Sequence, residues 1–107
     1  MEIGKERRVS IRVPPSLLKK VEEKGRRLIQ GLGVTTTRSA IIRMCIMRYI
    51  GQVNGNEVAH QDEYMVTTTI RLDEDVYQLV LAKAKEKGVT VSDIIRACMS
   101  LYAGDGQ

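Results

Sequence analysis

The chain has 107 residues, 43% of them hydrophobic, and a formal charge of +4. This size allows one compact domain or two very small ones, and the apolar content argues against disorder throughout. No apolar run approaches the roughly 20 residues of a transmembrane helix, and no pattern typical of a secretory signal peptide occurs, so we expect a cytoplasmic protein. Residues 1–50 carry 12 Lys+Arg against 4 Asp+Glu, whereas residues 51–107 carry 5 against 9, so the two halves differ strongly in charge.

The first periodic segment is residues 8–13, in which polar and apolar residues alternate. This pattern predicts a half-buried strand. Its outward residues would be Arg8, Ser10 and Arg12. A helix is predicted to begin at residues 14–16 (PPS), because proline suits the first helical turn. The apolar stripe of that helix would comprise Leu17, Leu18, Val21, Leu28 and Leu32. Gly25, inside the helix, has no explanation from the sequence.

A second helix is predicted to begin at Thr37, since threonine is a good N-cap residue. Its apolar residues cover more than one stripe, so we expect it to be buried on several sides. They are Ile41, Ile42, Cys45, Ile46 and Tyr49. Residues 51–65 are rich in Gly and Asn and lack periodicity, which predicts a linker. His60 lies in this linker without a second histidine, so we expect neither a metal site nor a cofactor.

Residues 66–107 repeat the plan of residues 1–50. A weaker strand is predicted at residues 67–72, with Thr68, Ile70 and Leu72 inward and Thr67, Thr69 and Arg71 outward. Acidic residues 73–75 suit the start of the next helix, and Gly88 suits its end. The stripe of that helix would be Val76, Leu79, Val80 and Ala84. Thr90 and Asp93 have the spacing of a capping box before a final helix. The apolar residues of that helix are Ile94, Ile95, Cys98, Leu101 and Tyr102.

The repetition is visible in the letters themselves. IIRMC at residues 41–45 returns as IIRAC at residues 94–98, an offset of 53, and Tyr49 and Tyr102 share that offset. The strands are offset by 59, so the first unit is longer between its strand and its second helix. The two cysteines occupy equivalent positions among apolar neighbours, and we expect buried free thiols. We therefore predict two units, at residues 1–50 and 66–107, joined by a linker at residues 51–65.

One strand and two helices cannot bury a core alone, because the strand has no ladder partner. Two copies solve this by pairing their strands antiparallel above interlocked helices. The predicted fold is mainly α with a two-stranded antiparallel β-ribbon, formed by two β-α-α units as an intramolecular pseudo-dimer. Each unit could instead pair with its own copy in another chain, although the tether favours internal pairing.

The outward face of such a ribbon is polar and basic, and a two-stranded ribbon fits the major groove of B-DNA. Arginine, serine and threonine all contact base edges there. The predicted base-contacting residues are Arg8, Ser10, Arg12, Thr67, Thr69 and Arg71. The amino ends of the second helices offer amide and hydroxyl groups to phosphates. The predicted phosphate-contacting residues are Thr35, Thr36, Thr37, Thr90, Val91 and Ser92.

The sequence resembles the ribbon-helix-helix family of the Arc, MetJ and CopG repressors over residues 7–50 and 66–103. Residues 88–92 (GVTVS) match the turn before the second helix of the family. Residues 33–37 (GVTTT) match it less closely, because the segment from Gly33 to the second helix is two residues longer than the segment from Gly88. The tandem arrangement is similar to fused members of the TraY type. The resemblance implies a cytoplasmic, nucleoid-associated protein whose strands contact bases, most simply a transcriptional repressor.

Three roles remain open at this point. The first is the repressor, in which Arg-Ser-Arg opposite Thr-Thr-Arg predicts an asymmetric site and a larger effect of replacing Arg12 than Thr69. The second is an accessory protein of a conjugative relaxosome. The third is a protein-interaction module that uses Lys24, Arg26 and Arg27. We expect no enzyme activity, because no nucleophile, base and orienting acid stand in a recognisable spacing. The expected partner is double-stranded DNA, with possible self-association of pseudo-dimers on it, and we expect no membrane or small-molecule ligand.

Overall fold

The computed structural model describes residues 6–30, 36–54 and 64–104. In chain order they form β1 (Glu6–Val13), α1 (Pro15–Gln30), α2 (Arg38–Tyr49), a short 3-10 turn η1 (Ile50–Gln52), β2 (Val66–Asp73), α3 (Glu74–Lys87) and α4 (Val91–Gly104). The described part of the chain is therefore mainly helical, with four α-helices and one two-stranded sheet. This confirms the predicted fold class at that level. We call β1, α1 and α2 unit one, and β2, α3 and α4 unit two.

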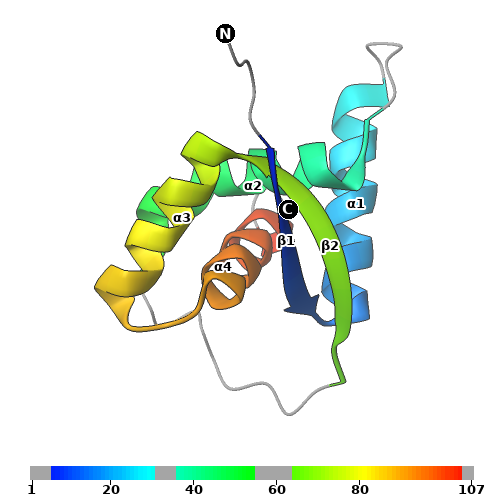
Figure 1. Cartoon of the computed structure of the whole chain (residues 1–107). Coiled ribbons are helices and arrows are strands. Elements are labelled where there is room, and N and C mark those ends of the chain that lie inside the picture. Colours follow the sequence, from blue (N-terminus) through cyan, green and yellow to red (C-terminus); the bar gives the residue numbers. More distant parts are fainter. Residues whose placement is uncertain (1–5, 31–35, 55–63, 105–107) are drawn as a thin grey trace, which may run out of the picture.

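The two strands pair with each other, antiparallel and within one chain. Glu6 lies opposite Asp73 at one end, Ser10 opposite Thr69 in the middle, and Val13 opposite Val66 at the other end. Figure 1 shows this ribbon in front of α2 and α4, with α1 and α3 to either side. One face of the ribbon therefore covers the helices, and the other carries no described helix.

The core lies between the inner ribbon face and the second helices of both units. Alternation along β1 buries Val9, Ile11 and Val13, as predicted, and β2 buries Ile70 and Leu72. Thr68, the one polar residue among the predicted inward positions of β2, is half-buried. Beneath the ribbon, α2 and α4 pack against each other. Their fully buried residues include Ile41, Ile42, Cys45, Ile46, Ile94, Ile95, Cys98 and Met99. An isolated two-stranded ribbon is marginal in water, so this apolar layer stabilises it.

The first helices bury less than the sequence pattern indicates. Leu18 and Val21 of α1, and Val76 and Val80 of α3, are buried as predicted. Leu28 and Leu79 were predicted to continue these stripes, but these residues are 58% and 49% exposed, so that prediction is wrong. Each first helix flanks the core and buries a narrow stripe, whereas the second helices are enclosed on several sides. Leu32 lies outside the described residues.

Gly25, unexplained by the sequence, marks the closest approach of α1 to α2. A Cβ atom placed on Gly25 would lie 2.7 Å from Cγ2 of Ile41, closer than real Cβ contacts allow. Glycine lowers helix propensity, so its presence here reflects a steric requirement. The strand offset of 59 makes Ala84 the equivalent residue of α3, and Ala84 is also buried. A small residue therefore lies at this position in both units.

The two cysteines are free and buried, as predicted. Burial raises the pKa of the Cys45 thiol to about 12, and the neighbouring Cys98 acts in the same direction. A thiol with so high a pKa is protonated at neutral pH and is a poor nucleophile. Cys45 therefore behaves as a small apolar core residue.

Candidate nucleic-acid interface

The outer face of the ribbon gathers the six residues that were predicted to contact bases. All six are exposed. The register arranges them as three cross-strand rows, Arg8 with Arg71, Ser10 with Thr69, and Arg12 with Thr67. Residues that lie 55 to 63 positions apart in the sequence thus share one small surface. Its chemistry is three guanidinium groups and three hydroxyl groups.

The three guanidinium groups on this face have no ion-pair partner within the described part of the chain. Most other described arginines do have one. Arg7, at the end of β1 but on the opposite face, binds Glu74 at 3.2 Å and lies 4.4 Å from the ring centre of Tyr77. Further ion pairs hold Arg26, Arg38, Arg43 and Arg96. The charges of Arg8, Arg12 and Arg71 are therefore available to a ligand.

Two serines of the second helices hold the ribbon in place. The backbone N–H of Arg71 donates to Oγ of Ser39 at 2.9 Å, and that of Arg12 donates to Oγ of Ser92 at 3.0 Å. These N–H groups point away from the opposite strand, so the exposed rows are non-hydrogen-bonded pairs of the ladder. In such pairs the Cα atoms lie about 4.5 Å apart and the side chains are at their closest. Each serine thus fixes the backbone beneath an outward arginine.

Ser39 was missed in the sequence, and Ser92 was assigned to phosphate contact. The repeat offset of 53 pairs these two serines and could have revealed their common role. The structure gives both hydroxyls a ribbon N–H as donor. Because a hydroxyl that accepts one hydrogen bond can still donate another, the phosphate assignment of Ser92 stays a prediction.

The amino ends of α2 and α4 lie beside opposite ends of the ribbon and are capped differently. At α2, Thr37 accepts a hydrogen bond from the backbone N–H of Ala40 at 3.2 Å. At α4, the predicted capping box is present. The N–H of Thr90 donates to Asp93 at 3.1 Å, and the N–H of Asp93 donates to Thr90 at 3.0 Å. The amides of the first two residues of each helix, which precede the capped one, have no carbonyl partner in the same helix and can meet an anion.

The remaining predicted phosphate contacts lie in or near these ends. Thr37 and Thr90 are exposed, while Thr36 and Val91 are half-buried. Thr35 lies outside the described residues. The structure therefore places the described members of this set at the two helix starts, one group in each unit.

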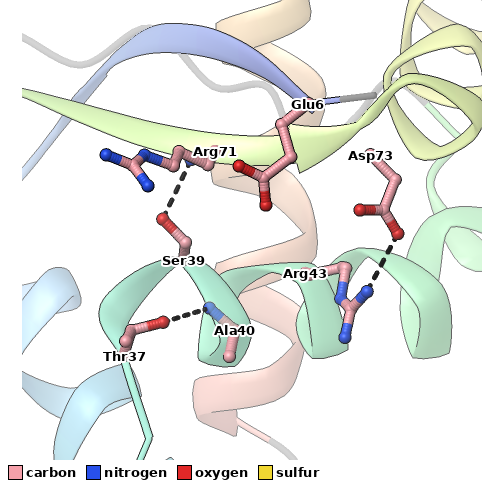
Figure 2. A pocket seen from close by; sticks show the side chains of 7 residues that line it. All are labelled: Glu6, Thr37, Ser39, Ala40, Arg43, Arg71 and Asp73. Carbon is pink, nitrogen blue, oxygen red and sulfur yellow. Dashed lines mark hydrogen bonds and ion pairs between the residues drawn. The ribbon is translucent and has the colours of Figure 1, made fainter. Parts of the chain in front are cut away.

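A polar hollow of about 450 Å³ lies at the start of α2, between that helix and the end of the ribbon. Figure 2 shows its lining residues, Glu6, Thr37, Ser39, Ala40, Arg43, Arg71 and Asp73. The guanidinium of Arg43 binds the carboxylate of Asp73 at 3.0 Å. In the figure the guanidinium of Arg71 points away from this pair. The row of Arg8 and Arg71 therefore lies near the ribbon end that faces α2, two residues in from Glu6 and Asp73.

The other ribbon end faces α4 and is held by Arg96, the residue equivalent to Arg43. Arg96 donates to the backbone carbonyl of Arg12 at 2.7 Å and also binds Asp93. Burial alone would raise the pKa of Asp93, but the hydrogen bonds from Thr90 and the charge of Arg96 outweigh it and lower that pKa. Asp93 is therefore an anion that occupies the first turn of α4.

Arg38, in the first turn of α2, is a further residue that the sequence did not single out. Its guanidinium binds the carboxylate of Glu22 in α1 and donates to Oγ1 of Thr68 at 2.8 Å. It thereby joins α1, α2 and β2. Val91 occupies the equivalent position of α4, so the first turn of α2 has a cation where α4 has an apolar side chain.

No helix in the described ranges is both long and apolar enough to cross a bilayer. Within the same ranges, no cluster of three or more His, Cys, Asp or Glu residues could hold a metal ion. No protein-family model, curated protein or solved structure matches the chain.

Proposed function

We propose that the chain is a sequence-specific protein of the ribbon-helix-helix type that binds double-stranded DNA, with both halves of the fold in one polypeptide. The observation that carries the proposal is the outer ribbon face. It presents three arginines that form no ion pair with any residue the structure describes, on a backbone fixed from below by Ser39 and Ser92. A surface whose cations lack such partners is suited to a ligand rich in hydrogen-bond acceptors.

The major groove is such a ligand. It is wide enough for a two-stranded ribbon and presents N7 and O6 of guanine, to which one arginine can donate two hydrogen bonds. Ser10 and Thr69, in the middle row, can bond to base edges or touch thymine methyl groups. In this arrangement the rows of the ribbon read bases directly.

The amino ends of α2 and α4 would then lie over the backbones on either side of the groove. Free amides and exposed hydroxyls at a helix start favour phosphate. Such contacts position the ribbon and carry no sequence information themselves. We propose transcriptional repression as the role, since a protein bound at a promoter blocks access to it.

The protein-interaction alternative loses support from the same structure. Lys24 donates to the backbone carbonyl of Tyr102 at 2.6 Å and lies 4.5 Å from the centre of its ring. Arg26 is paired with Glu22 at 3.4 Å. Two of the three cations proposed for docking a partner are therefore engaged within the fold.

The test is the affinity for a selected duplex, measured by fluorescence anisotropy, for wild type and for Arg12→Ala, Arg71→Ala and Thr69→Ala. Loss of a bidentate base contact costs about 1 to 3 kcal/mol, so the arginine variants should bind at least several-fold more weakly and discriminate less against a scrambled duplex. Thr69→Ala should lose less than Arg12→Ala.

Arg48→Ala is the matched control. Arg48 is exposed in the last turn of α2, nine residues from Ser39, which corresponds to about 14 Å along the helix. It removes the same charge away from the ribbon and should leave base discrimination intact. Equal binding of cognate and scrambled duplexes by wild type and by both arginine variants would overturn the proposal.

A further inference from the structure

The two ends of the ribbon are chemically different, although the backbone frame is the same. The end beside α2 has two arginines in one row, Arg8 and Arg71, and neither is ion-paired within the described ranges. The end beside α4 has Arg12 opposite Thr67. By the strand offset of 59, Arg71 is equivalent to Arg12, so the difference lies in the pair formed by Arg8 and its equivalent, Thr67.

The row of Arg8 and Arg71 places like charges directly across a non-hydrogen-bonded pair, where side chains are closest. Such an arrangement is destabilising in the free protein. Neither side chain has a carboxylate partner among the described residues to relieve the repulsion. A surface with several hydrogen-bond acceptors under this row would relieve it.

The neighbouring row indicates which acceptors these are. Glu6 and Asp73 form the next row toward the end of the ribbon, and their carboxylates turn toward the hollow beside α2 (Figure 2). Carboxylates repel phosphate, but they can accept a hydrogen bond from the amino group of cytosine. Asp73 is already bound to Arg43, whereas Glu6 is exposed. Guanine edges with their paired cytosines fit this end of the ribbon better than the sugar-phosphate backbone does.

We propose that the ribbon binds an asymmetric duplex in one orientation, with two neighbouring guanines under the row of Arg8 and Arg71 and a single guanine under the row of Arg12 and Thr67. This inference rests on the proposed function and specifies the ligand of that site. The two rows are four residues apart, about 13 Å along a strand. That length corresponds to roughly four base pairs at 3.4 Å each.

The first experiment selects bound sequences from random duplexes with the full-length wild-type chain. The expected result is a non-palindromic site with two G·C pairs clustered at one end. Replacing the guanines at that end should weaken wild type about 5- to 150-fold per lost bidentate contact. The same change should cost Arg8→Ala one contact fewer than wild type, because only Arg71 is left to contact a guanine at that end.

Two substitutions then make the ribbon symmetric in opposite ways. Arg8→Thr leaves one arginine and one threonine in each outer row, and Thr67→Arg puts two arginines in each. Both variants should select near-palindromic sites. Thr67→Arg should also gain affinity, about 5- to 150-fold, for a duplex that carries the two-guanine end on both sides. Circular dichroism checks that both variants fold, and Arg48→Ala is again the control that should keep the wild-type site.

The outcomes separate this inference from the proposed function. Wild type that binds all duplexes equally overturns both. Wild type that selects a palindrome, or variants that keep the wild-type asymmetry, overturn the inference and leave sequence-specific binding in place.

Discussion

Unit one and unit two have the same backbone plan and different surface chemistry. The contacts that build the plan occur in both, since Ser39 and Ser92 each accept from the strand, and the second helices share their buried positions. The helix starts differ. In α2 the first turn contains Arg38 and no acid, whereas in α4 Asp93 closes a capping box. The two units therefore share the buried contacts that build the fold, whereas their exposed surfaces differ in charge and hydrogen bonding.

The largest expected effect on stability tests whether the two units unfold together as one cooperative domain. Ile42 and Ile95 are equivalent residues with side chains 0% exposed. Truncation of a buried isoleucine to alanine costs about 2 to 5 kcal/mol. Ile42→Ala and Ile95→Ala should therefore each lower the free energy of unfolding by such an amount, in a single transition followed by urea and circular dichroism. Two separate transitions, each shifted by one variant, would show that the units fold independently.

The next effect concerns the contact between the first and second helices. Gly25→Val places a branched side chain where Ile41 already lies, and overpacking of this kind costs about 1 to 3 kcal/mol. Thermal unfolding measures the loss. Gly25→Val combined with Ile41→Ala should lose less than the sum of the two single losses, because the smaller side chain at residue 41 leaves room for the valine. Gly51→Val is the control, since a Cβ there would meet no atom within 4 Å.

A smaller effect on stability is expected from the N-cap residues of α2 and α4. Loss of an N-cap side chain costs about 0.5 to 2 kcal/mol. Thr90→Ala should be in the upper part of this range and Thr37→Ala in the lower part, because the Thr90 side chain belongs to a reciprocal pair of bonds. Urea unfolding of the two variants side by side measures the difference. Equal losses would mean that the capping box adds nothing to a single cap.

The charge of Asp93 gives this comparison a pH dependence. Its pKa is lowered by folding, so its contribution is complete above the ordinary value of 3.8 and is lost as the pH falls through the lower folded value. The stability difference between wild type and Asp93→Asn should be constant from pH 7 to about pH 5 and should shrink below about pH 4. Urea unfolding across this range checks it. A difference that grows in acid would contradict the assigned direction.

The smallest expected signal is the reaction of the two buried thiols with a labelling reagent. Burial and the high pKa of Cys45 should prevent labelling of the native protein by a thiol reagent at pH 8, whereas the unfolded chain should label at both cysteines. Rapid labelling of native Cys45 would show that the space between α2 and α4 opens readily.

The sequence predicted the repeated strand-helix-helix order because alternation in the strands and apolar repeats in the second helices are strong local patterns. It also predicted the six outward ribbon residues, since alternation fixes which side chains share a face. It could not predict that Arg8 lies opposite Arg71, because register depends on packing between distant segments. The predicted burial of Leu28 and Leu79 was wrong for a similar reason, since periodicity does not reveal how wide the covered stripe of a helix is. Gly25 needed the position of Ile41 to be understood.

Both strands of the ribbon come from one polypeptide. In a ribbon built from two separate chains, dilution favours dissociation and with it the loss of the sheet. Here assembly is a first-order event, so the midpoint of unfolding should be the same at nanomolar and micromolar protein. A cell that makes only a few copies of this chain would still have every copy complete.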